Sequence, residues 1–87
     1  MSGGTIAVKP TARQLDLLRA IARFRKARGY SPTVREMAKE MKLAAQSGVL
    51  THLRMLQIKG LVRRDEGVQR STLITEAGER VLSEVSA

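Results

Sequence analysis

Apolar side chains near the start of the chain recur every three or four residues, as on one face of a helix. Thr11 and Gln14 form a capping box, with a hydroxyl at the N-cap and a glutamine at the third helical position. Gly29 supplies the left-handed residue that ends many helices. The pattern predicts a helix from Ala12 to about Arg28, with its apolar face formed by Leu15, Leu18, Ile21, Ala22 and Phe24.

A second capping box, Thr33 with Glu36, starts another helix that we expect to reach about Lys42. Its apolar positions are Val34, Met37, Ala38 and Met41. The preceding segment, Tyr30 to Pro32, must be extended, because the residue before a proline is pushed out of the helical region. It is predicted to be a short strand or a linker, and residues 43–45 to be a brief turn.

The third helix is predicted from about Gln46 to Lys59, with Gly60 as its stop. On a wheel of 100° per residue, Val49, Leu53 and Leu56 fall on one stripe that should face the core. The opposite face combines short polar groups, one arginine and two apolar side chains: Ser47, Leu50, Thr51, Arg54 and Ile58.

Two β-type runs follow, residues 61–64 and 68–75, joined by a glycine-containing turn at residues 65–67. Thr75 can cap a final helix. The apolar side chains of this helix, Val81, Leu82 and Val85, are expected to complete the core, to form a dimer seam, or to do both.

These elements predict a mainly α protein with a small β-hairpin, in the order α-β-α-α-β-β-α. Two helices joined by about three residues, followed by a hairpin, are typical of a winged helix-turn-helix whose second helix enters the major groove of DNA. At 87 residues the chain is expected to form one domain, residues 11–87, after a flexible arm at residues 1–10.

Charge favours the same interpretation. Sixteen basic and eight acidic side chains give a net charge of +8, which indicates a polyanionic partner, with nucleic acid ahead of an anionic membrane surface. Residues 1–64 carry fourteen of the basic and three of the acidic groups, whereas residues 65–87 have an acidic excess. The basic surplus therefore coincides with the helix-turn-helix and the first strand of the wing.

The chain lacks the residues that metal binding and enzymatic catalysis commonly need. With no cysteine and one histidine, the chain is not expected to bind a metal or any other cofactor, or to be an enzyme. No stretch is typical of a signal peptide or a membrane span, so we expect a cytoplasmic protein without a membrane partner.

Several segments together resemble the DNA-binding domain of the SOS repressor LexA. The similarity runs without gaps from about Thr11 to Asp65, and it is carried by residues 11–14, 29–38, 52–53 and 59–64. The resemblance implies a winged helix-turn-helix that binds operator DNA, usually as a homodimer. LexA continues into a self-cleaving protease domain for which 87 residues leave no room, so a stand-alone DNA-binding domain is expected.

The resemblance also implies roles for individual residues. Phosphate contacts fall on Thr11, Arg13, Arg35 and Lys59. Base readout falls on the start of the third helix, and we include Ala45, Gln46, Ser47, Gly48, Leu50, Thr51 and Arg54. A serine stands where the family often has asparagine, and Leu50 and Thr51 replace acidic residues, so the operator of the family cannot be carried over.

The wing adds Arg63, Arg64 and Arg70, which are expected to meet a phosphate or the minor groove; the alternative is pairing with Asp65 or Glu66. The basic end of the first helix, residues 23–28, is either a further DNA contact or a solvated face.

The sequence predicts a regulator of transcription that binds double-stranded DNA at specific sequences, and a repressor is the kind of regulator that we expect. The alternatives are a winged-helix module that binds a regulatory protein or nuclease, and a non-specific nucleoid-type DNA binder.

Overall fold

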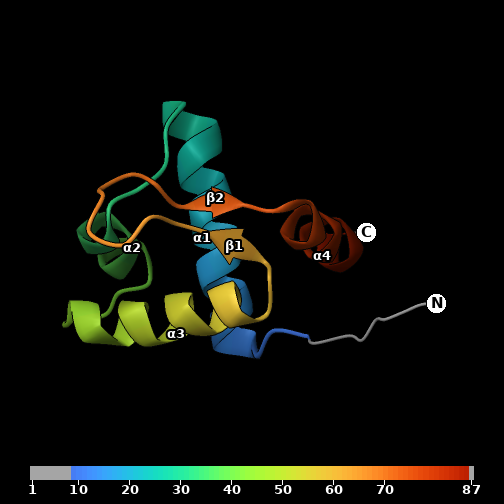
Figure 1. Ribbon diagram of the computed structural model, residues 1–87, viewed down its shortest axis with the longest axis horizontal. Coiled ribbons are helices and arrows are strands. Elements are labelled where there is room, and N and C mark those ends of the chain that lie inside the picture. Colours follow the sequence, from blue (N-terminus) through green and yellow to red (C-terminus); the bar gives the residue numbers. More distant parts are fainter. Residues whose placement is uncertain (1–8, 87) are drawn as a thin grey trace.

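The computed structural model describes residues 9–86, which form four helices and two short strands (Figure 1). Residues 1–8 of the expected N-terminal arm lie outside the described residues. The elements are α1 (Ala12–Arg28), α2 (Val34–Glu40), α3 (Gln46–Ile58), β1 (Val62–Arg63), β2 (Leu73–Ile74) and α4 (Glu76–Ser86).

Both predicted capping boxes are present, and they set the starts of α1 and α2. In the first, the Thr11 hydroxyl accepts from the Gln14 backbone N–H at 3.2 Å, and Gln14 Oε1 accepts from the Thr11 N–H at 3.0 Å. Thr33 and Glu36 repeat the arrangement at 3.1 and 2.8 Å. Each box satisfies two backbone donors that have no partner within the helix.

The core lies where α1, α2 and α3 meet. The predicted stripe of α3, Val49, Leu53 and Leu56, is fully buried. On α1 the buried stripe is rotated from the predicted one, because Leu17 is fully buried and Leu15 is only half-buried. The other core side chains are Leu18, Ala20, Ile21, Met37, Ala38, Met41, Leu61 and Val62.

The strand considered for residues 30–32 is absent: this described segment is an extended linker between α1 and α2. Ser31 and Pro32 are buried, while Tyr30 is exposed and packs edge-on against Phe24, with ring centroids 5.8 Å apart. An isolated extended segment has no neighbour for a backbone ladder, so the expected order loses its first strand.

The hairpin also differs from the prediction, because each strand has only two residues. Val62 pairs with Ile74 and Arg63 with Leu73, which leaves residues 64–72 as a connection that we call the wing loop. The turn at Asp65 to Val68 forms as expected, but the Ser71 hydroxyl binds backbone groups of both residues. The loop therefore folds on itself, and these backbone groups are not available for a ladder.

The final helix closes the far side of the core. The Thr75 hydroxyl accepts from the Gly78 N–H at 3.1 Å and donates to the Gly60 carbonyl at 2.6 Å, which joins the start of α4 to the end of α3. Val81 and Leu82 pack against the core, whereas Val85 is exposed.

Candidate nucleic-acid interface

The exposed face of α3 is the surface that the sequence predicts to read bases. Ala45, Gln46, Ser47, Leu50, Thr51 and Arg54 are all exposed, and Gly48 is half-buried. The buried stripe of Val49, Leu53 and Leu56 anchors the opposite side of the helix, so these side chains project away from the core.

Hydrogen bonding within α3 limits what this face offers. The Thr51 hydroxyl donates to the Ser47 carbonyl at 3.0 Å, the residue one turn earlier. Thr51 therefore presents a methyl group and acceptor lone pairs, while Arg54 presents the one cationic group of the predicted readout set.

One end of α3 is joined to the start of α1. The Lys59 ammonium donates to the Lys9 carbonyl at 2.9 Å and to Gln14 Oε1. Gln14 is buried, and its oxygen also serves the capping box. This link places Thr11 and Arg13 beside the C-terminal end of α3, with Arg13 half-exposed and 3.6 Å from Asp16.

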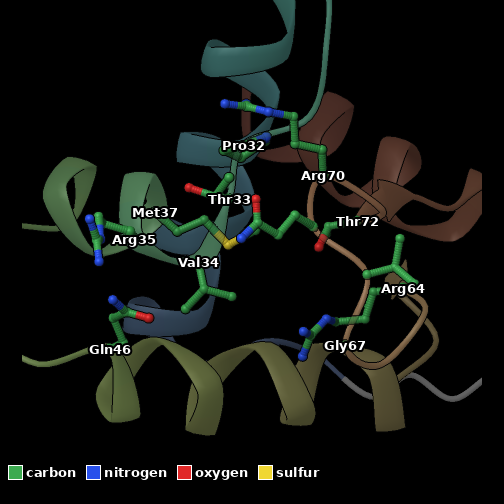
Figure 2. Close-up of a pocket in the computed structure, with 12 residues that line it drawn as sticks. Pro32, Thr33, Val34, Arg35, Met37, Gln46, Arg64, Gly67, Arg70 and Thr72 are labelled. Atoms are coloured by element: carbon green, nitrogen blue, oxygen red, sulfur yellow. The ribbon is translucent and has the colours of Figure 1, made fainter.

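The other end of α3 lies beside the start of α2. Arg35 is exposed, and together with Gln46 it borders a cleft of about 460 Å³ between α2 and the wing loop (Figure 2). Pro32, Val34 and Met37 contribute apolar side chains to this cleft.

The three arginines of the wing occupy different environments. Arg63 is exposed on β1. Arg64 is only 12% exposed and lies 3.7 Å from Glu66, so the alternative of local charge pairing applies to it, within the loop and not across the strands.

Arg70 lies against the start of α2. Its guanidinium makes two contacts with the Glu36 carboxylate, at 2.9 and 3.3 Å, and donates to the Ser31 carbonyl at 3.1 Å. It also lies over the Tyr30 ring, 4.5 Å from the centroid. The Thr33 backbone N–H and then Arg70 hold the pKa of Glu36 below its ordinary value. The sequence showed Glu36 as a capping residue, and nothing in it indicated a partner 34 residues away.

The basic end of α1 lies far from α3, beside the linker residue Ser31 that also binds Arg70 (Figure 1). In Figure 1 the start of α1 lies beside α3, and its C-terminal end is at the opposite side of the molecule. There Arg25 donates to the Ser31 hydroxyl at 3.0 Å, and Arg28 lies over the Phe24 ring. This placement favours the solvated-face interpretation of residues 23–28.

Within residues 9–86, no three histidine, cysteine or acidic side chains are grouped so that they could hold a metal ion. None of the described helices is both long enough and apolar enough to cross a bilayer.

Comparison with known proteins agrees with this geometry. The chain is 42% identical over 73 residues to a LexA repressor from Bacillus licheniformis, covering 84% of this chain and 35% of that protein. For the LexA repressor of Bacillus subtilis the identity is 44% over 68 residues, covering 78% and 33%. The chain thus spans about a third of the length of these relatives.

A solved structure supports the fold independently. A transcriptional regulator from Thermotoga maritima superposes with a TM-score of 0.68 at 24% identity, over 87% of this chain and 51% of that one. The family model for the LexA DNA binding domain matches residues 8–71. Because this match covers more than half of the 87 residues, the chain belongs to the LexA DNA-binding domain family.

Proposed function

We propose that this protein is a sequence-specific regulator of transcription, a repressor, that places α3 in the major groove of double-stranded DNA and the wing, residues 61–75, at the backbone or minor groove. One observation carries the proposal: the exposed face of α3 is flanked at both ends by basic side chains that belong to other elements. Arg35 of α2 lies at the start of α3, and Arg13 of α1 lies at its end.

The dimensions of α3 suit this role. Its 13 residues make a helix about 20 Å long, and a major groove about 12 Å wide admits an α-helix. The proposed base-reading set is Ala45, Gln46, Ser47, Gly48, Leu50, Thr51 and Arg54.

Phosphates on either side of the groove would meet the flanking groups. Lys59 has used two of its three N–H donors within the protein, so one is left for a phosphate oxygen. The Thr11 hydroxyl accepts the capping bond and keeps its proton for donation. The proposed phosphate and wing contacts are Thr11, Arg13, Arg35, Lys59 and Arg63, whereas Arg64 is paired with Glu66 within the wing loop.

Repression is proposed from the relatives, which are named LexA repressors. Dimerisation is what the resemblance to the LexA family implies. We propose that the chain binds as a homodimer, with Val85 and the neighbouring Val81 and Leu82 of α4 contributing the seam. The exposed position of Val85 supports this choice.

Selection from a random DNA pool tests the function. Bound DNA is sequenced after selection at two salt concentrations, and the dissociation constant of the best site is then measured over a salt series. We expect one palindromic site whose half-sites are centred about 34–36 Å apart, or a multiple of that distance. The logarithm of the binding constant should fall by about 0.9 per phosphate contact per logarithmic unit of salt.

A second candidate is binding of a protein partner through α3, which the 70% exposure of Ile58 favours. If the selection enriches no DNA sequence and a protein partner stays bound to the chain at high salt, this candidate is supported and the repressor proposal is contradicted. Equal affinity for all sequences with a steep salt dependence would instead indicate a nucleoid-type DNA binder.

A further inference from the structure

Arg70 is part of the wing, yet its cationic group is directed toward the start of α2 and the linker before it. The guanidinium meets the Glu36 carboxylate with both terminal nitrogens, the Ser31 carbonyl with one of them, and the face of Tyr30. A bidentate pair of this kind fixes direction as well as distance. These partners belong to α2 and to the linker before it, so Arg70 connects the wing loop to the helix-turn-helix.

The backbone supports the same interpretation. Arg70 has a φ of 60°, in the left-handed region that non-glycine residues rarely adopt. Such a conformation persists when surrounding contacts favour it, and the Arg70 side chain makes several contacts with α2 and the linker before it. Next to it, the Ser71 hydroxyl holds the turn at Asp65 and Val68. The loop is therefore braced internally by Ser71 and fixed externally by Arg70.

The partner of Arg70 has a second task. Glu36 Oε1 accepts the Thr33 N–H in the capping box that starts α2, and the same oxygen receives Arg70. One carboxylate thus joins the start of α2 to the wing loop. It also offsets the charge of Arg70, so the pair as a whole presents little positive charge to a phosphate.

We infer that Arg70 is a positioning residue of the DNA interface, which holds the wing loop against the start of α2 through Glu36 and Ser31, and that it is not a phosphate contact. This inference rests on the DNA-binding function proposed above. The alternative is that Arg70 leaves all of these partners when DNA arrives and binds a phosphate.

Glu36→Gln separates the two interpretations by the sign of its effect. Glutamine keeps the capping box, because Gln14 performs the same task at the start of α1. Removing a negative charge near DNA should strengthen binding if Arg70 contacts phosphate, since the guanidinium is released. If Arg70 positions the loop, the same change should weaken binding about threefold to tenfold, although the protein becomes more basic.

Arg70→Gln completes the test, with Glu40→Gln as the matched control. Glu40 is also on α2, but it pairs with Arg23 of α1 and not with the wing. Positioning predicts that Arg70→Gln matches the loss of Glu36→Gln, that the double variant loses no more, and that the salt slope is unchanged. A slope lower by about 0.9 for Arg70→Gln, or tighter binding by Glu36→Gln, would overturn the inference. Glu40→Gln should show no loss of affinity.

A measurement without DNA keeps this inference separate from the function on which it rests. Backbone ¹⁵N relaxation of the free protein should show increased motion of residues 64–72 in Glu36→Gln and in Arg70→Gln, but not in Glu40→Gln. If the loop stays as rigid as in the wild type, the positioning role is wrong. If the loop loosens as expected but the wild type binds no DNA, the proposed function fails and the structural link stands.

Discussion

Thr51 shows how the local environment of one side chain narrows its chemistry. Its hydroxyl proton is donated to the Ser47 carbonyl, so the group facing outward is a methyl with acceptor lone pairs beside it. A methyl contact with the methyl group of thymine is one of the simple forms of base readout. Thr51 is therefore better suited to apolar recognition than to donating a hydrogen bond.

Two substitutions separate the contribution of the Thr51 methyl group from that of its hydroxyl. Thr51→Val keeps the methyl and removes the hydroxyl, and Thr51→Ser does the opposite. We expect Thr51→Val to retain the base preference of the wild type, and Thr51→Ser to lose about fourfold in discrimination, because a buried methyl group contributes about 0.8 kcal/mol. Competition binding with each base at the contacted position measures both; the reverse ranking would assign readout to the hydroxyl.

Glu36 links stability to pH through its lowered pKa. The Thr33 backbone N–H and the Arg70 guanidinium stabilise the ionised form, so the folded pKa lies below the ordinary 4.5. Stability from this group is therefore complete above the ordinary pKa and is lost as pH falls through the lower folded value. Urea unfolding at several pH values measures this. The free energy of unfolding of the wild type should exceed that of Glu36→Gln near neutrality, and the difference should shrink below about pH 4.5. A difference that is independent of pH would contradict the assignment.

At the scale of elements, two helical glycines differ in whether the packing around them leaves room for a side chain. Gly78 in α4 is packed so closely against Leu61 and Ile74 that an added Cβ would collide with the Leu61 carbonyl oxygen and would lie 2.7 Å from Ile74 Cγ2. Gly48 in α3 has room, because the nearest atom to such a Cβ is Leu43 Cδ1 at 3.4 Å. Packing of α4 thus requires a glycine, whereas packing of α3 does not.

The same substitution should therefore act in opposite directions. Gly78→Ala is expected to destabilise the fold by about 1–3 kcal/mol, because a backbone atom cannot move aside as a side chain does. Gly48→Ala should stabilise it by up to about 1 kcal/mol through helix propensity, while it weakens DNA binding if Gly48 lies at the bases. Denaturant unfolding and DNA titration of both variants test this. A stabilising Gly78→Ala would mean that α4 is not packed as described.

At the scale of the whole molecule, the position of a charge matters more than the total. Arg13 and Lys26 both lie on α1, but they are separated by most of the length of a 17-residue helix. At 1.5 Å per residue the two are about 20 Å apart, roughly twice the screening length at physiological salt. Lys26 is therefore too far from the α3 end of the molecule to share its phosphates.

Arg13→Gln and Lys26→Gln form a matched pair of equal charge change. We expect Arg13→Gln to weaken specific and random DNA alike and to lower the salt slope by about 0.9. Lys26→Gln should leave the slope unchanged and affinity within about twofold. Equal effects of the two variants would show that DNA extends along α1 to its C-terminal end.

The helices of this protein follow from the sequence because their signals are local. A capping box acts over three residues, and one helical turn brings apolar side chains three and four positions apart onto one face. The starts of α1 and α2, and the division of α3 into a buried stripe and an exposed face, could therefore be predicted without a structure.

Contacts between residues far apart in the sequence could not be predicted and became visible only in the tertiary structure. Arg70 meets Glu36 across 34 residues and Lys59 meets Gln14 across 45, and no local pattern encodes either pair. Most of the wing is loop, although its residues favour strands. The Ser71 hydroxyl binds the backbone of the loop, and the Arg70 guanidinium connects the loop to α2 and to the linker before it. The sequence thus determined which helix faces outward and with which groups. Only the packing of the elements decided how far the wing forms a ladder, and which of the basic side chains already have partners within the protein.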